Sequence, residues 1–137
     1  MEELVSACGH EHVSATHAST FEVTSDDYLT PAGDCILAVE ADRTPADFEA
    51  GFVDACQSHD ARIVATIEVG DHVERIEGRG HPDLTFESDR SLVGRTSGYV
   101  DDRTVMVEAS ASAGDVDRDM IAALSEGADL TLELRVE

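Results

Sequence analysis

Three histidines near the N-terminus are followed by acidic residues, and together they could carry chemistry. His10 and His12 are two positions apart, so both imidazoles would lie on one face of a strand, where they could bind one metal ion. His17, Glu22 and Asp34 would then supply further ligands or a general acid and base. One alternative is therefore a small acid–base or metal-dependent enzyme, with His10, His17, Glu22 and Asp34 as its candidate catalytic residues.

The same histidines have a structural interpretation, which we favour. Imidazole nitrogens readily form hydrogen bonds with the backbone of turns and loops. A cupin-type metal site would need a glutamate three or four residues after His12, but Ala15 and Thr16 occupy those positions. Cys35 begins an apolar run, in which burial would raise the pKa of its thiol. The sequence therefore predicts no bound metal and no cofactor.

The arginines gather in one segment of this acidic chain. Five of the nine fall between residues 75 and 103, where six acidic residues leave a formal charge of only −1. Guanidinium groups bind phosphates through paired hydrogen bonds, and a tyrosine ring can stack on a base. This favours a non-catalytic binding module for an anionic ligand, either RNA or a phosphorylated metabolite. The candidate ligand-binding residues are Arg75, Arg79, Arg90, Arg95, Ser97, Tyr99 and Arg103. The alternative is that these arginines pair with nearby acids in a solvated network.

The composition indicates the environment of the protein. The 137 residues carry a formal net charge of −21, and all nine basic residues are arginines. These charges repel one another in dilute buffer, whereas at molar salt the screening length falls to about 3 Å. We therefore expect a protein from the cytoplasm of a salt-loving archaeon. An apolar fraction of 42% argues against disorder, and no apolar run is long enough to span a membrane. The oligomeric state stays open.

An internal repeat predicts how the chain is organised. Residues 34–69 match residues 102–136, which divides the chain into halves at about 1–70 and 71–137. Halves of this length would be marginal alone, so we expect one domain over residues 1–137.

The repeat also bears on the histidines. Gly9-His10 recurs as Gly80-His81, and Thr20–Glu22 recurs as Thr85–Glu87, so the first half would contain six extra residues, among them His17. His10 and His81 would then share a structural role, such as donating to a backbone carbonyl. A unique pocket should accordingly gather His17 with Glu22 and Asp34.

Each half is predicted to contain three strands, a helix and a final strand. Thr44 and Ser112 each precede an aspartate by three residues, which is typical of a capping box at a helix start. Gly70-Asp71 predicts a two-residue hairpin turn. The final strands alternate apolar and polar residues, with the apolar sets Ile63, Ala65, Ile67, Val69 and Leu130, Leu132, Leu134, Val136. The expected fold is mainly β (α+β): two tandem βββαβ repeats with pseudo-two-fold symmetry, forming a sandwich or closed barrel with two helices packed outside.

Several motifs resemble an archaeal family known as domain of unknown function 371. They include Gly9-His10-x-x-Val13-x-Ala15-Thr16-His17-x-x-Thr20-Phe21-Glu22 and Leu29-Thr30-Pro31-x-Gly33-Asp34-Cys35-Ile36. The resemblance spans nearly the whole chain and implies a mainly-β, sandwich-like fold in an archaeal cytoplasm, but no activity or catalytic residues. The chain departs from the family pattern at His12, where asparagine is usual, and at Ala111, where lysine is usual.

Overall fold

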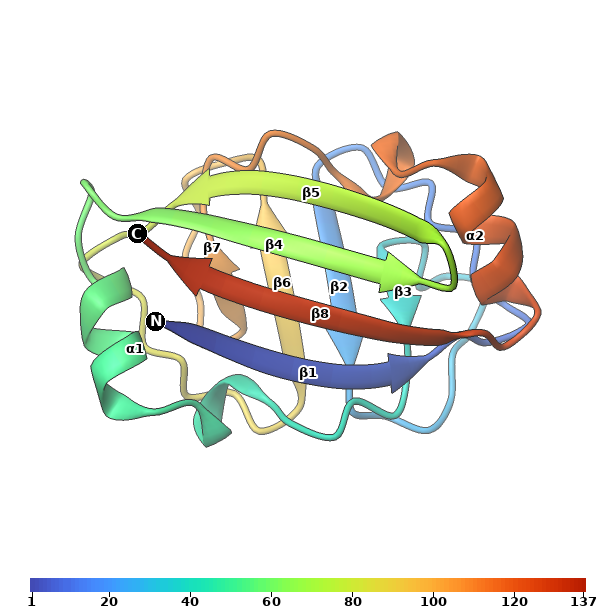
Figure 1. The fold of residues 1–137 in the computed structure, drawn as a ribbon, viewed down its shortest axis with the longest axis horizontal. Helices are drawn as coiled ribbons and strands as arrows, with labels where there is room; N and C mark the ends of the chain where they lie inside the picture. Colours follow the sequence, from blue (N-terminus) through green and yellow to red (C-terminus); the bar gives the residue numbers. More distant parts are fainter.

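The computed structural model describes all residues 1–137, which form two four-stranded sheets packed face to face (Figure 1). Sheet A is antiparallel, with strand order β1 (Glu2–Cys8), β8 (Asp129–Val136), β4 (Arg62–Val69) and β5 (His72–Arg79). Sheet B has the order β3 (Ile36–Ala38), β2 (Thr20–Thr24), β6 (Ser91–Arg95) and β7 (Thr104–Met106). Its central pair is antiparallel and its two outer pairs are parallel. The strands of the two sheets cross steeply in Figure 1.

Alternating apolar residues direct one face of β4 and one face of β8 inward, as predicted. Ile63, Ala65 and Ile67 of β4 are fully buried, while Thr66 and Glu68 between and beyond them are not. The predicted hairpin is also confirmed, because Gly70 adopts a φ of +58° and Val69 pairs with His72 across the turn. A left-handed residue at this position matches the twist of the two strands.

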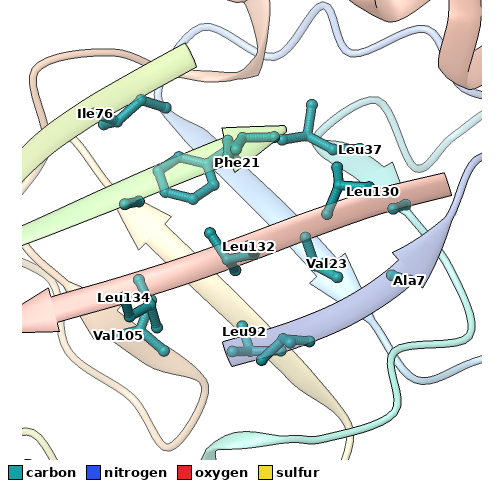
Figure 2. Close-up of a cluster of buried hydrophobic side chains, with 14 of the residues drawn as sticks. Ala7, Phe21, Val23, Leu37, Ile76, Leu92, Val105, Leu130, Leu132 and Leu134 are labelled. Atoms are coloured by element: carbon teal, nitrogen blue, oxygen red, sulfur yellow. The ribbon is translucent and has the colours of Figure 1, made fainter. Parts of the chain in front are cut away.

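The buried side chains of both halves form one hydrophobic cluster between the sheets. Figure 2 shows Phe21, Val23 and Leu92 of sheet B facing Leu132 and Leu134 of sheet A. Within sheet B, Gly94 of β6 leaves room for the ring of Phe21, its partner on β2, because a Cβ there would lie 2.2 Å from that ring. The core therefore depends on residues that are far apart in the sequence.

Two helices lie outside the sheets, at opposite ends of the sandwich (Figure 1). They are α1 (Ala50–Cys56) and α2 (Arg118–Ser125), and each buries an apolar stripe against the core. The stripe residues are Phe48, Phe52 and Cys56 in the first half and Val116, Met120 and Leu124 in the second, as predicted. Neither helix has the length and apolar character needed to span a bilayer.

The predicted helix starts were wrong by several residues. The capping boxes exist, with the Thr44 amide donating to Asp47 Oδ2 at 2.8 Å, but they cap the short 3-10 helices η1 (Pro45–Asp47) and η2 (Ala113–Asp115). Phe48 and Val116 then adopt extended backbones with ψ of 149° and 142°, so each α-helix begins only after this break. A capping motif fixes a first turn but does not determine whether the helix continues.

A closed barrel, the other predicted architecture, is not formed. Single-residue bridges join the corners of the sheets, at Cys8–Val39 and at Arg79–Val107, with no continuous ladder between the edge strands. The two sheets therefore remain separate layers.

The hydrogen bonds at these corners show which residues of the two halves are equivalent. Cys8 and Val39 exchange two backbone hydrogen bonds, as do Arg79 and Val107. The amide of Ala41 donates to Thr24 of β2, and the amide of Ala109 donates to Arg95 of β6, so β2 corresponds to β6.

The repeat alignment around the histidines was therefore wrong. Thr85–Glu87 precedes β6 and does not correspond to the β2 residues Thr20–Glu22. Thr24 follows His10 by fourteen positions, and Arg95 follows His81 by the same number, so the first half has no extra segment here. The alignment relied on the identical residues Thr-Phe-Glu in the two halves. Structural equivalence depends instead on the position of the backbone, and the two Thr-Phe-Glu segments occupy different positions in the fold. An origin by duplication stays a prediction.

Candidate functional site

The predicted histidine and carboxylate residues do not form one pocket. His10 follows Gly9, whose amide donates to Ala128 just after α2. His17 lies beside Asp34, whose carbonyl accepts a hydrogen bond from the His17 amide at 3.1 Å. Glu22 accepts a hydrogen bond from the Cys35 thiol at 3.4 Å. The three surface hollows of the protein are lined by none of the four candidate catalytic residues, and no group of three or more metal-ligating side chains is present.

His10 and His81, the two histidines that the repeat relates, each accept a hydrogen bond from a nearby backbone amide. His10 Nδ1 accepts from the amide of His12 at 3.0 Å, and His81 Nδ1 accepts from the amide of Asp83 at 3.0 Å. The shared role was predicted, but its direction was wrong, because the rings accept a hydrogen bond rather than donating one.

The second half contains a residue that makes the same hydrogen bonds as His17, although the sequence suggested no counterpart. His17 Nδ1 accepts from the amides of Ser19 and Thr20 at 3.2 and 3.1 Å. In the second half the Ser88 hydroxyl occupies this position and accepts from the amides of Arg90 and Ser91. The His17 ring nitrogen thus stabilises a turn that a serine stabilises elsewhere in the same fold.

The cysteine near this segment is not activated. Burial is the main reason that the pKa of the Cys35 thiol rises to about 11, and the neighbouring Glu22 carboxylate adds to the effect. A thiol with this pKa is almost fully protonated at neutral pH and is a poor nucleophile. The prediction that burial would raise the pKa of the Cys35 thiol is therefore confirmed.

The arginines of residues 75–103 divide into two groups. Arg90 forms an ion pair with Asp26 at 2.8 Å, while Arg95 and Arg103 share Asp101 at 2.9 and 3.1 Å. These three arginines therefore form ion pairs with neighbouring acids, which is the alternative to ligand binding that the sequence left open.

The two polar candidates beside this group are also engaged within the protein. The Arg95 guanidinium lies 4.7 Å from the centre of the Tyr99 ring. Ser97 Oγ accepts a hydrogen bond from the Tyr99 amide. A base that stacked on Tyr99 would have to share its ring with Arg95.

The remaining two arginines, Arg75 and Arg79, are exposed on β5 and have no carboxylate partner within 4.0 Å. They lie on the outer face of sheet A, where a hollow of about 480 Å³ is open to solvent. Its lining residues are Leu4, Arg62, Val64, Thr66, Glu68, Arg75, Thr131, Glu133, Arg135 and Glu137. A second hollow of about 220 Å³ continues past Arg62 to Arg79.

Strand register determines the centre of the larger hollow. Thr66 of β4 lies opposite Arg75 of β5 on one side and Glu133 of β8 on the other, and Leu4 of β1 lies opposite Glu133. These four side chains come from four adjacent strands and share one face of the sheet. The floor is Val64, which is only 7% exposed although it faces away from the main core.

The arginines of this surface differ in how they are held. Arg62 bridges Glu77 and Glu137, whose hydrogen bonds raise the pKa of its guanidinium, with Glu77 making the largest contribution. Arg135 contacts Glu2 at 3.0 Å and Glu133 at 3.5 Å. The Arg75 side chain has neither an ion pair nor a hydrogen bond, so its five N–H donors face solvent.

The charge of this surface is close to balance. The two hollows are lined by four arginines and five glutamates, whereas the whole chain carries −21. Sequence reasoning missed Arg62 and Arg135 as members of the site, although the alternation of the final strands already placed both on the polar face. The alternation thus indicated which face these arginines occupy, but only the pairing of the strands brought them together into one cluster.

The fold places the protein in the class of α+β sandwiches, with two four-stranded sheets and two helices. Residues 5–137 match the model of a family described as domain of unknown function (DUF371), and the chain belongs to this family. The chain is also 39% identical over 136 residues to an uncharacterised protein of the archaeon Methanocaldococcus jannaschii, which covers 99% of this chain and 100% of that protein.

Proposed function

We propose that the protein is a non-catalytic binding module for a phosphorylated small molecule, which it holds in the larger hollow on sheet A. The observation that carries the proposal is the free guanidinium of Arg75 in that hollow. The other two arginines that line this hollow, Arg62 and Arg135, both pair with glutamates, so Arg75 is the one whose guanidinium is free to bind a ligand. A phosphate would provide the paired acceptors that this guanidinium lacks.

The surroundings of Arg75 suit a small ligand. A volume of about 480 Å³ falls within the range of roughly 300–1,000 Å³ that is typical of small-molecule sites. The hydroxyls of Thr66 and Thr131 offer further donors, and Leu4 and Val64 offer an apolar surface.

RNA, the other anionic ligand that the sequence favoured, receives less support. Binding of single-stranded RNA commonly uses aromatic rings on which bases stack, and no aromatic residue lines either hollow on this face. Tyr99 is next to Arg95, away from both hollows. We therefore assign the site to a compact phosphate-bearing molecule.

The composition supports a further part of the proposal, namely that the protein works in the cytoplasm of a salt-loving archaeon. The absence of lysine and the charge of −21 both suit concentrated salt, in which exposed carboxylates are screened. Arg75 must then bind its ligand at high ionic strength. Directed hydrogen bonds would accordingly matter more than long-range attraction.

Isothermal titration calorimetry with ribose 5-phosphate, at constant high salt, tests the proposal. A hydrogen bond to a charged group contributes about 1.5–3 kcal/mol, so Arg75→Gln should weaken binding roughly ten- to hundredfold. Arg90→Gln is the matched control, because it removes the same charge from an exposed arginine just before β6 of the other sheet. It should leave binding unchanged.

Two results would overturn the proposal. One is equal weakening by both substitutions, which would mean that ribose 5-phosphate responds to overall charge alone. The other is tighter binding of a single-stranded oligoribonucleotide that does not depend on Arg75, which would favour RNA. Binding by the wild type that depends on Arg75 and not on Arg90 supports it.

A further inference from the structure

The edge of sheet A at β5 has unsatisfied backbone groups. Arg79 exchanges two backbone hydrogen bonds with Val107, so its peptide groups point away from β4. Because this direction alternates along an antiparallel strand, Val73 and Arg75 also point their N–H and C=O groups away from β4. No residue of the chain hydrogen-bonds to these four groups. Val73 is 59% exposed, so this edge is open to solvent.

The opposite edge of the same sheet is closed at the equivalent position. Leu4 lies four residues before Cys8, as Arg75 lies four residues before Arg79. The guanidinium of Arg43 donates to the Leu4 carbonyl at 3.0 Å and to the Glu3 carboxylate at 2.7 Å.

The residue that closes the β1 edge is missing from the second half. Arg43 follows Val39 by four residues, and Ala111 follows Val107 by four residues. An alanine cannot reach the Arg75 carbonyl, so the edge of β5 lacks the side chain that covers the edge of β1. An uncovered strand edge is a template for pairing with another strand.

We propose that a second copy of this chain pairs with this edge, so that the β5 strands of two molecules run antiparallel and join two A sheets into one. Charge complementarity selects the second copy. With Val73 opposite its own symmetry mate, Asp71 lies opposite Arg75 of the other molecule, and His72 lies opposite Glu74. Opposite charges therefore face each other once on each side of the two-fold axis, where Asp71 meets Arg75.

Neighbouring registers are unfavourable. A shift that centres the pairing on Glu74 places two glutamates opposite each other, and a shift to Arg75 places two arginines opposite each other. Like charges directly opposite destabilise a strand pair. The strand itself is neutral, since His72–Arg79 contains two arginines and two glutamates. It is therefore suited to bring together two molecules that each carry −21.

The dimer does not exclude a ligand in the hollow. The Arg75 guanidinium has five N–H donors in a planar fork, enough for both Asp71 of a second copy and one phosphate. Dimer formation can thus be measured without any phosphate, separately from the proposed function.

Sedimentation equilibrium over a concentration series, in phosphate-free buffer at about 2 M potassium chloride, tests the dimer, because screening at that ionic strength removes most of the repulsion. The wild type should show the mass of a dimer. Ala111→Arg should weaken the dimer at least tenfold by covering the Arg75 carbonyl. Val73→Pro should do the same by removing an edge N–H that has no partner within the chain.

Leu4→Lys is the matched control, since Leu4 is an equally exposed residue on the closed edge. It should leave the dimer intact. Circular dichroism confirms the fold of each variant, and Ala111→Arg keeps the test valid if Val73→Pro does not fold. A wild-type protein that stays monomeric at high salt, or an Ala111→Arg variant that dimerises as well as the wild type, overturns the proposal. The proposal would also be overturned if the wild type stayed monomeric and bound an extended peptide, which would indicate a different partner for this edge.

Discussion

Phe52→Ala tests the packing that fixes α1 to the end of the sandwich. Phe52 is 1% exposed, and its ring meets those of Phe48 and Phe86 with centroids 5.6 and 6.1 Å apart. Phe48 and Phe86 are themselves 6.0 Å apart, so the three rings form a triangle. Phe86 comes from the second half, and the substitution therefore removes a contact between the halves as well as the anchor of the helix.

The expected loss follows from this geometry. Truncating a buried phenylalanine to alanine costs about 3–5 kcal/mol, and an aromatic pair contributes about 0.5–1.5 kcal/mol beyond the area it buries. Both pairs with Phe52 are edge-on, which is a favourable arrangement. We expect Phe52→Ala to lower the free energy of unfolding by about 4–5 kcal/mol. Met120, fully buried at the equivalent position of α2, has no such ring partners, and Met120→Ala should cost less, within about 2–5 kcal/mol.

Urea denaturation at constant high salt, followed by circular dichroism, measures both values, since urea leaves the ionic strength unchanged. Tyr28→Ala is the control, because Tyr28 is 56% exposed and its loss should change stability by no more than about 0.5 kcal/mol. A cost below about 2 kcal/mol for Phe52→Ala, or a larger cost for Met120→Ala, would refute the aromatic anchor.

Three further predictions concern charge, pH and metals. The melting temperature should fall sharply below about molar salt, because thirty acidic residues then repel one another, and a temperature independent of salt would contradict the role of screening. Burial would raise the pKa of Asp101, but hydrogen bonds from Arg103 and Thr104 outweigh it and bring the pKa to about 2. This folded-state pKa is below the unfolded value of 3.8, so Asp101 stabilises the fold fully above about pH 4 and loses this effect as the pH falls toward 2. Asp101→Asn should therefore destabilise the protein much more at pH 7 than at pH 2, as urea titrations at both pH values would show. Elemental analysis of salt-washed protein should find well under one equivalent of zinc, iron or manganese, and a stoichiometric metal that is lost in His12→Asn would show that the histidines form a site.

Local patterns in the sequence were sufficient for most of the elements. Alternation defined β4 and β8, the Gly70-Asp71 pair defined the hairpin between β4 and β5, and the helical stripes identified Phe52 and Met120 as core residues. These predictions succeeded because strand and helix periods relate each residue to close sequence neighbours. The candidate site was only partly predictable, since Arg75 stood out in a nearly neutral segment, whereas Arg62 and Arg135 lay outside it.

The sequence by itself determined which side chains face inward, because the period of each element decides this locally. Only the tertiary structure decided which polar side chains meet, because that depends on strand order and register between segments tens of residues apart. Arg62, Arg75 and Arg135 became neighbours when β5, β4 and β8 paired. The pairing of β2 with β6 in sheet B likewise showed that the turns at His17 and Ser88 are equivalent. The strand order of sheet A left β5 at an open edge, because that order depends on contacts between distant segments, which no local pattern records.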